Sequence, residues 1–193
     1  MFKGDVGGGA HFLLGFEWWP GLAPRAAGMS GSGGRNHRAG RHDDALGHLT
    51  EVRDLAERSD NPWIAAMSRV GLGTLALVRG RAEEARALLD EALGLAAHST
   101  RSVTLCLAAF ARWALVAGDP ERAALVAGAA EGLRSRAGLR TWPMLRQGEA
   151  KLVAQVRQAL GADHCDQVFA TGARLTQRDA VAAARAGAAP APR

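Results

Sequence analysis

One short phrase occurs three times in this chain, and each copy begins with a glycine. The copies occupy residues 40–45, 80–85 and 118–123, so their starts lie 40 and 38 residues apart. In each copy the glycine follows one helical pattern, and acidic residues and an alanine open the next. Self-similarity at this interval is typical of stacked helical arrays, in which each repeat is a hairpin of helices. The phrase therefore predicts a helical-repeat protein, whose stacked hairpins present an extended surface.

The composition agrees with closely packed helices. A chain of 193 residues is long enough for one domain with a hydrophobic core. Apolar residues account for 48% of the chain, aromatic residues for only 5%, and tyrosine is absent. Much of the apolar content is alanine, which favours helices that approach one another closely over a sheet. We therefore expect an all-α fold.

The net charge of +5 raises the question of nucleic-acid binding, which the distribution of charge addresses. Residues 1–42 hold five basic and two acidic side chains, and residues 172–193 hold four basic and one acidic. The body between them, residues 43–171, holds fifteen basic and sixteen acidic side chains. A phosphate backbone is bound by a concentrated basic face, which this body lacks. Nucleic-acid binding is therefore not expected of the body, and action through the basic termini stays open as an alternative function.

The cysteines and the apolar runs indicate a cytoplasmic protein. Cys106 and Cys165 are too far apart for a C-x-x-C motif, and we expect both to be reduced thiols. No apolar run approaches the roughly 18 residues of a membrane span. The apolar stretch at 10–16 is interrupted by Glu17, which argues against a secretory signal. We expect no membrane partner.

Glycine, proline and the apolar periodicity divide the chain into three parts. Residues 1–40 are predicted to be a disordered arm, since glycine costs a helix about 1 kcal/mol per position relative to alanine and residues 28–34 are mostly glycine. Residues 41–186 are predicted to be the helical domain, and residues 187–193 a disordered tail. Apolar spacing and capping residues predict its helices at about 42–58, 62–79, 81–97, 101–117, 119–136, 143–160, 163–171 and 177–186.

The second and third of these helices resemble a tetratricopeptide repeat. Leu72-Gly73 begins the pattern, and Ala85, Leu89 and Ala92 follow Gly73 by 12, 16 and 19 positions. A looser copy follows, and the first copy keeps only its second helix. The resemblance implies a short right-handed stack of helical hairpins, with packing positions at Leu72, Gly73, Ala85, Leu89, Ala92, Ala123, Ala127 and Ala130.

The same resemblance implies a partner-binding groove on the inner face of each hairpin's first helix. Arg112 is the one charged residue that this geometry places there. Either it meets an acidic group of a partner or it is an ordinary solvated arginine, and both interpretations stay open. The implied groove residues are Met67, Val70, Thr74, Leu77, Leu105, Ala108, Arg112 and Leu115.

A second resemblance lies in the C-terminal third. Residues 123–134 are similar to the phrase LLGAAEALR of large bacterial ATP-binding transcriptional regulators of the LuxR and SARP types. Leu160-Gly161, residues 169–172 and Leu175-Thr176 follow in matching order. Neither a G-x-x-x-x-G-K-[ST] motif nor a helix-turn-helix pattern is present. The resemblance therefore implies the repeat region of such a regulator, without the ATPase and DNA-binding domains, and we interpret the chain as a fragment of a larger signalling ATPase.

No constellation of residues predicts catalysis. The groups His42-Asp43-Asp44 and His164-Cys165-Asp166 contain metal-ligand types, but neighbouring side chains on a helix point about 100° apart and do not close around one ion. Cys165 and His164 lack a third residue that would orient them as a nucleophile pair. We therefore predict a non-enzymatic interaction module with no cofactor or metal. Its expected partner is a protein or peptide, sister domains of a regulator included, and its oligomeric state is left open.

Overall fold

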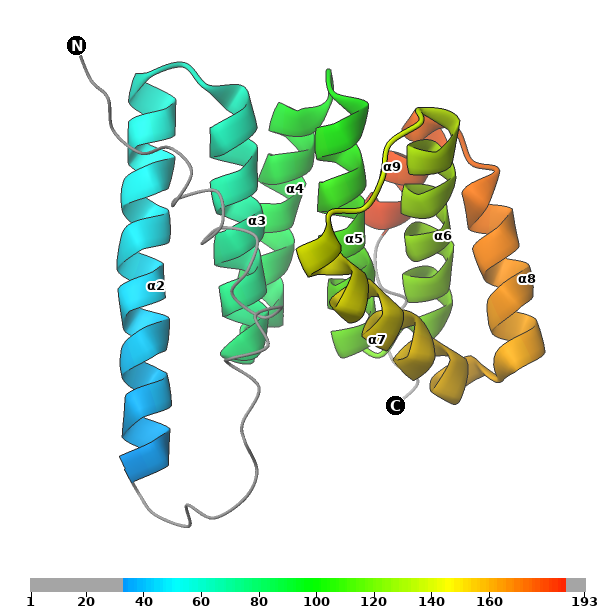
Figure 1. Cartoon of the computed structure of the whole chain (residues 1–193), viewed down its shortest axis with the longest axis horizontal. Coiled ribbons are helices and arrows are strands. Elements are labelled where there is room, and N and C mark those ends of the chain that lie inside the picture. Colours follow the sequence, from blue (N-terminus) through cyan, green and yellow to red (C-terminus); the bar gives the residue numbers. More distant parts are fainter. Residues whose placement is uncertain (1–32, 187–193) are drawn as a thin grey trace.

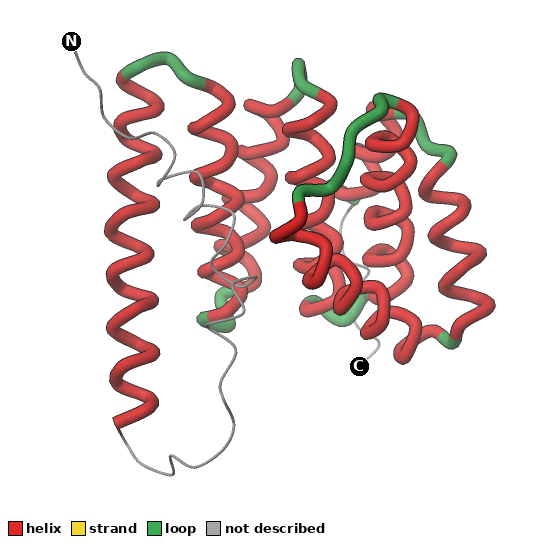
Figure 2. The backbone as a smooth tube through the Cα atoms, viewed as in Figure 1, coloured by secondary structure: helices red, strands yellow, loops and turns green. Residues whose placement is uncertain are grey.

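The computed structural model of the chain describes residues 33–186, and every regular element within them is a helix (Figures 1 and 2). The all-α class is thereby confirmed. The predicted arm lies outside the described residues except for residues 33–40, and the predicted tail at 187–193 lies outside them entirely. The helices are α2 (Gly33–Arg58), α3 (Pro62–Val78), α4 (Ala82–Ala96), α5 (Thr100–Val116), α6 (Pro120–Arg136), α7 (Pro143–Leu160), α8 (Ala162–Ala173) and α9 (Gln177–Arg185).

The first helix begins earlier than the sequence predicted. We expected it from about residue 42, with a disordered glycine-rich segment before it, yet α2 begins at Gly33. Residues 35–39 include arginine and alanine, which favour helices. Extending a helix that already exists also costs far less than starting one, because each added residue brings its own hydrogen bond. These gains outweigh the cost of Gly40 within the helix.

The three copies of the repeated phrase consequently differ in structure. Gly80 and Gly118 follow α3 and α5 with φ angles of 75° and 83°, which glycine adopts without steric cost. Gly40 instead lies inside α2. Two of the three glycines thus end a helix, and these two copies of the phrase mark the turns of the α3–α4 and α5–α6 hairpins.

Side-chain caps fix where the helices begin. The Asn61 carboxamide oxygen accepts a hydrogen bond of 3.1 Å from the Ile64 amide at the start of α3. The Asp119 carboxylate accepts one of 2.9 Å from the Arg122 amide at the start of α6. Each cap is followed by a proline, whose missing N–H costs nothing at the first helical position. These local signals are the reason that the predicted and observed helix ends agree closely.

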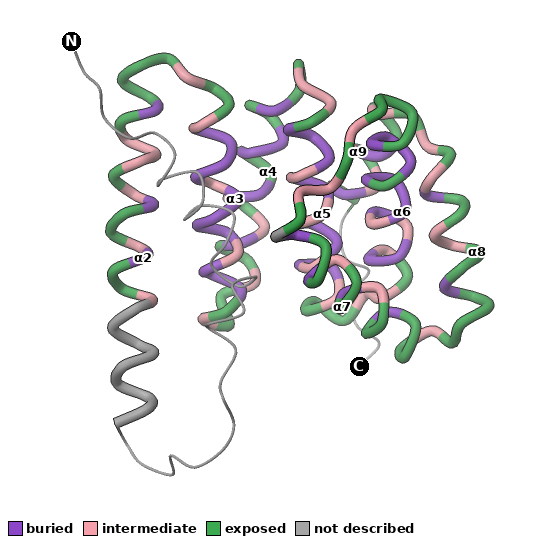
Figure 3. Tube along the Cα trace, viewed as in Figure 1, coloured by how far each residue is buried: buried purple, intermediate pink, exposed green. Residues whose placement is uncertain are grey.

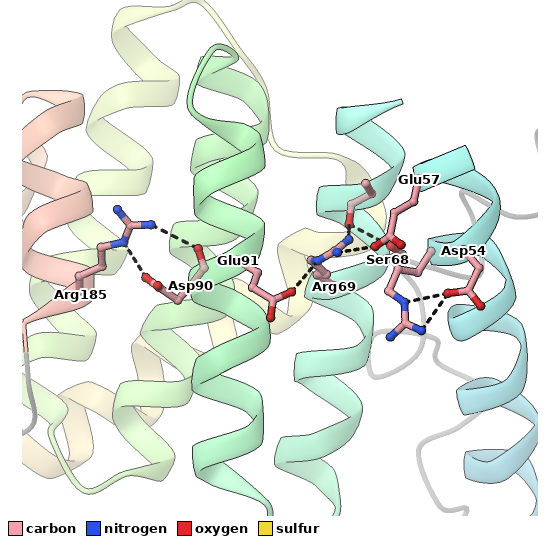
Figure 4. Close-up of polar contacts among 9 residues, drawn as sticks. Asp54, Glu57, Ser68, Arg69, Asp90, Glu91 and Arg185 are labelled. Carbon is pink, nitrogen blue, oxygen red and sulfur yellow. Dashed lines mark hydrogen bonds and ion pairs between the residues drawn. The ribbon is translucent and has the colours of Figure 1, made fainter. Parts of the chain in front are cut away.

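Helices α2 to α6 pack in chain order, and α3 also contacts α5. Burial follows this stack, since the sides of α3, α4, α5 and α6 that face neighbouring helices are buried (Figure 3). Arg69 on α3 links three helices of the stack, because it pairs with Glu57 of α2 and, at 2.8 Å, with Glu91 of α4 (Figure 4). Burial alone would lower the pKa of Arg69, but the hydrogen bonds and charges of Glu91 and Glu57 raise it.

After α6 the regular order ends. Helix α8 packs closely on α6, α7 contacts its neighbours much less, and α9 returns to α5 and α6. The last helix also reaches α4, where the Arg185 Nε atom lies 2.6 Å from an Asp90 carboxylate oxygen (Figure 4). At its other end, Gln177 donates a hydrogen bond of 3.0 Å to the Ala97 carbonyl. The inward side of α9 is made of alanine, with Ala180 and Ala184 fully buried.

No helix in residues 33–186 is long and apolar enough to cross a membrane.

Candidate functional site

A large hollow of the described surface lies beneath α7. It has a volume of about 470 Å³ and is bounded by α5, α6, α7 and α8. We call it the α7 groove. Its lining residues are Ala108, Ala127, Ala130, Glu131, Arg134, Arg146, Glu149, Ala150, Leu152, Val153, Ala154, Arg157 and Phe169.

The groove exists because α8, and not α7, takes the place directly against α6. A Cβ atom at Gly128 would lie 2.1 Å from the Phe169 carbonyl oxygen, and one at Gly132 would lie 2.0 Å from that of Ala173. A Cβ atom at Gly172 would lie 2.0 Å from the Leu125 carbonyl oxygen. The two helices are therefore in backbone contact, which only glycine permits. Helix α7 passes outside this pair and leaves the groove under itself.

Small side chains form the floor of the groove. Ala108 from α5 and Ala127 and Ala130 from α6 line it, and each presents only a methyl group. Phe169 adds to the lining from α8. The roof is one side of α7, where Ala150, Val153 and the other lining positions recur three or four residues apart. The interior is thus largely apolar, and its charged residues lie at particular points along the wall.

A buried ion network fixes the wall at the start of α7. The Arg134 guanidinium, 7% exposed, pairs with Glu149 of α7 at 2.7 Å and with Glu131 of its own helix at 2.7 Å. The Thr141 hydroxyl donates a hydrogen bond of 3.2 Å to the Glu149 carboxylate. Burial would lower the pKa of Arg134, but the hydrogen bonds and charges of Glu131 and Glu149 outweigh burial and raise it. Arg134 therefore stays charged and ties α7 and the preceding loop to α6.

At the other end of α7, Arg157 pairs with Asp166 of α8. Both side chains are half exposed, and solvent-exposed ion pairs of this kind contribute little to stability. A contact with the charged group of a partner would therefore replace this pair at little cost.

A second, smaller cavity of about 20 Å³ adjoins the groove at the loop between α6 and α7. The two share Arg134 as a lining residue. Arg101 and Arg140 line the smaller cavity and are exposed to solvent. The α6–α7 loop is thus the more basic end of the site.

The structure brings the predicted groove residues of α5 to this region. Ala108 lines the α7 groove and Leu105 lines the smaller cavity. Arg112 and Leu115 are half-buried on the same helix. The predicted lining from α5 therefore includes two residues that border a real hollow.

The predicted residues of α3 are placed differently. Met67 is 1% exposed, and Val70 and Leu77 are each 8% exposed. All three belong to the main hydrophobic core, and Thr74 is half-buried. On α3 these side chains are packed between helices, because α2 and α4 cover much of it.

The predicted packing positions lie in the interior of the stack. A Cβ atom at Gly73 would lie 3.1 Å from Leu89 Cγ and 3.3 Å from the Ala85 carbonyl oxygen. Ala127 is the exception, since it is half-buried and lines the α7 groove. The buried members are Leu72, Gly73, Ala85, Leu89, Ala92, Ala123 and Ala130.

Sequence reasoning missed the contribution of α7 and the reason for the groove. The spacing of Gly128 and Gly132, four residues apart on α6, was the available signal, because it aligns two glycines on one face of a helix. Nothing in the residues 143–160 taken alone showed that α7 would pass over this face.

Within the described part of the chain, no group of three or more histidine, cysteine, aspartate or glutamate side chains is placed so that it could hold a metal ion. Both cysteines are buried. Burial raises the pKa of the Cys106 thiol to about 12, so this thiol is protonated at neutral pH.

No family model matches the sequence, and neither a curated protein nor a solved structure matches the chain.

Proposed function

We propose that this chain is a non-catalytic protein-interaction module that binds a peptide or helix of a partner in the α7 groove. The observation that carries the proposal is the groove itself, about 470 Å³ in volume, with an apolar floor and a wall held by Arg134. Apolar hollows of about 300–1,000 Å³ with a few convergent polar groups are typical of binding sites.

The residues that line the groove are better suited to binding the side chains of a partner than to catalysing a reaction. The floor alanines leave room for a larger apolar group, and burial of such a group stabilises a complex by about 25 cal/mol per Å² of apolar area. Three of the ionised residues on the wall are paired, since Arg134 contacts both Glu131 and Glu149. Because these three residues pair with one another, we assign them a role in holding the wall and in recognising the partner.

We further propose that the module is related to the repeat region of LuxR- and SARP-type bacterial regulators and works in the cytoplasm, with sister domains of a signalling ATPase among its partners. Two of the segments that carry this resemblance, 123–134 and 169–172, lie on α6 and α8. Gly128, Gly132 and Gly172 within these segments make the close α6–α8 contact. The resemblance therefore falls on residues with a specific packing role, which supports the proposal.

The experiment compares two tryptophan substitutions on the same helix. Ala154→Trp places a large ring in the α7 groove, whereas Ala159→Trp places the same ring on α7 at an exposed position outside the groove lining. A random peptide library is selected against the full chain, and the enriched peptides are measured on both variants by fluorescence anisotropy. We expect peptides that bind the wild-type chain and Ala159→Trp equally and lose at least about tenfold in affinity on Ala154→Trp, because a loss of about 1.4 kcal/mol is tenfold.

Circular dichroism of each variant verifies that the fold is retained. Equal binding to both variants, or the absence of any peptide that depends on the groove, would overturn the proposed function.

A further inference from the structure

We infer that the partner segment is acidic and amphipathic, with an apolar anchor in the α7 groove and carboxylates at the α6–α7 loop. This inference rests on the proposed function and specifies the chemistry of the partner. It follows from three arginines around this loop, Arg101, Arg140 and Arg146, which we call the arginine rim.

The arginine rim carries charge that the described residues do not neutralise. None of its three members forms an ion pair within residues 33–186. Arg146 Nε lies 3.5 Å from the Thr141 carbonyl oxygen, at the limit of a hydrogen bond. All three residues are exposed, so their guanidinium groups are accessible to a partner.

The acidic residues that line the α7 groove are already engaged. Glu131 and Glu149 line the groove, but both pair with the buried Arg134. Breaking a buried pair to serve a surface arginine would leave the Arg134 charge uncompensated, which is strongly unfavourable. The arginine rim therefore stays available for the carboxylates of another molecule.

The rim lies at one end of the groove. Arg146 lines the α7 groove, and Arg101 and Arg140 line the adjoining cavity that shares Arg134 with it. Helix α7 also begins here, at Pro143, so the positive end of its dipole adds to the same field. The apolar floor at Ala108, Ala127 and Ala130 lies beyond it, under α7.

The arrangement of arginines at one end and an apolar floor beyond them determines which kind of segment the groove binds. An apolar side chain fits over the alanine floor, and two or three carboxylates along the same segment meet the arginine rim. A nucleic acid would need free cations along its whole path. Here the three rim arginines gather at one end, Arg157 at the other end of α7 is paired with Asp166, and the floor is apolar. Charge complementarity thus selects an acidic peptide.

The test uses the full chain and a charge-reversed variant, Arg101→Glu/Arg140→Glu/Arg146→Glu. Its matched control is Arg58→Glu/Arg174→Glu/Arg178→Glu, which reverses three exposed arginines that line neither hollow. The same random peptide library is selected against each protein. A second rim variant with glutamine at the three positions removes the charge without reversing it, in case the reversed variant fails to fold.

We expect the wild-type chain and the control to select acidic peptides with an apolar anchor, and the charge-reversed variant to select neutral or basic ones. The acidic peptides should bind the glutamine variant on the order of tenfold more weakly, because solvent-exposed ion pairs each contribute only a small part of the binding free energy. Added salt should weaken binding to the wild-type chain and affect the glutamine variant less.

Two outcomes would overturn this inference while leaving the proposed function intact. One is selection of neutral or basic peptides that lose affinity on Ala154→Trp, and the other is acidic peptides that bind the wild-type and rim variants equally. A single-stranded oligonucleotide that binds through the arginine rim more tightly than any acidic peptide would also overturn it. The absence of groove-dependent peptides would instead defeat the proposed function itself.

Discussion

The α3–α4 hairpin and the α6–α8 pair both place a glycine of one helix against the other helix, yet the two contacts differ in kind. At Gly73 on α3, the nearest atoms across the contact are the Leu89 side chain, 3.1 Å from the position of an added Cβ atom. At Gly132 on α6, the nearest atom is the Ala173 carbonyl oxygen, 2.0 Å from that position. A side chain adjusts by rotation, whereas the backbone of a packed helix adjusts only if the whole helix moves.

This difference explains why the stack changes direction after α6. The Leu89 side chain lies between α3 and α4 at Gly73 and keeps the two backbones apart. The glycine contact brings α8 so close to α6 that no side chain lies between them at those points. The next helix in chain order, α7, is left outside, and the α7 groove lies beneath it.

The largest effect is expected from Gly132→Ala in the α6–α8 pair. The new methyl group would overlap the Ala173 carbonyl oxygen, and α8 would have to move away from α6. We expect a loss of about 4 kcal/mol in the free energy of unfolding, measured by urea denaturation. Labelling of the buried thiols should report the same change locally, with Cys165 on α8 becoming reactive sooner than Cys106 on α5.

The control for this substitution is Gly94→Ala on α4, where an added Cβ atom meets nothing within 4 Å. Alanine there should stabilise the chain by roughly 0.5–1 kcal/mol, through helix propensity alone. If Gly132→Ala proved as mild as Gly94→Ala, the backbone contact between α6 and α8 would be refuted.

The next effect is expected from Leu89→Ala in the α3–α4 hairpin. Leu89 is fully buried, and its truncation leaves a cavity in the main core. We expect a loss of about 3 kcal/mol, measured in the same way. Leu55→Ala, at a leucine that is 58% exposed, serves as the comparison and should change stability by no more than about 0.5 kcal/mol.

A smaller effect is expected from Gly73→Ala. The new methyl group would lie 3.1 Å from Leu89 Cγ, which has to shift slightly, while helix propensity improves by about 1 kcal/mol. The two terms oppose each other, and we expect a net change of no more than about 1 kcal/mol in either direction. Combined with Leu89→Ala, the same methyl group should fill part of the cavity, so that the double variant is more stable than the sum of the single changes. Strict additivity in this cycle would show that the two residues do not touch.

The smallest effect is expected where α9 joins the two regions. Asp90→Asn removes the carboxylate that pairs with Arg185, and both side chains are about half exposed. A loss of about 0.5 kcal/mol is expected, and it should disappear at high salt. A loss of several kcal/mol that persisted in salt would mean that the pair is far less solvated than the structure shows.

The helix positions could be predicted from the sequence because their signals are local. Asn61 with Pro62 and Asp119 with Pro120 each contain, within two residues, the cap and the proline that start a helix. Gly40 was misleading for the same reason, since a local glycine signal does not reveal whether the neighbouring segment extends the helix.

The site could be predicted only in part because it depends on contacts between distant segments. The tetratricopeptide resemblance predicted Ala108 as a groove residue, and Ala108 lines the α7 groove. It could not place Arg146 or Ala154 there, because the position of α7 follows from glycines in α6 and α8. It also set Met67 in a groove, whereas neighbouring helices cover that residue.

The return of α9 has a consequence for how this protein folds. In a simple stack each hairpin contacts only its neighbours, so folding spreads from any point and the ends unravel independently. Here Arg86 donates a hydrogen bond to the Arg185 carbonyl, 99 residues later in the chain, and this contact forms only after α4 is in place. Contacts between such distant residues slow folding. They also make the stability of the early helices depend on the docking of the last one. The hairpins should therefore unfold together, in one cooperative transition, as long as α9 is docked.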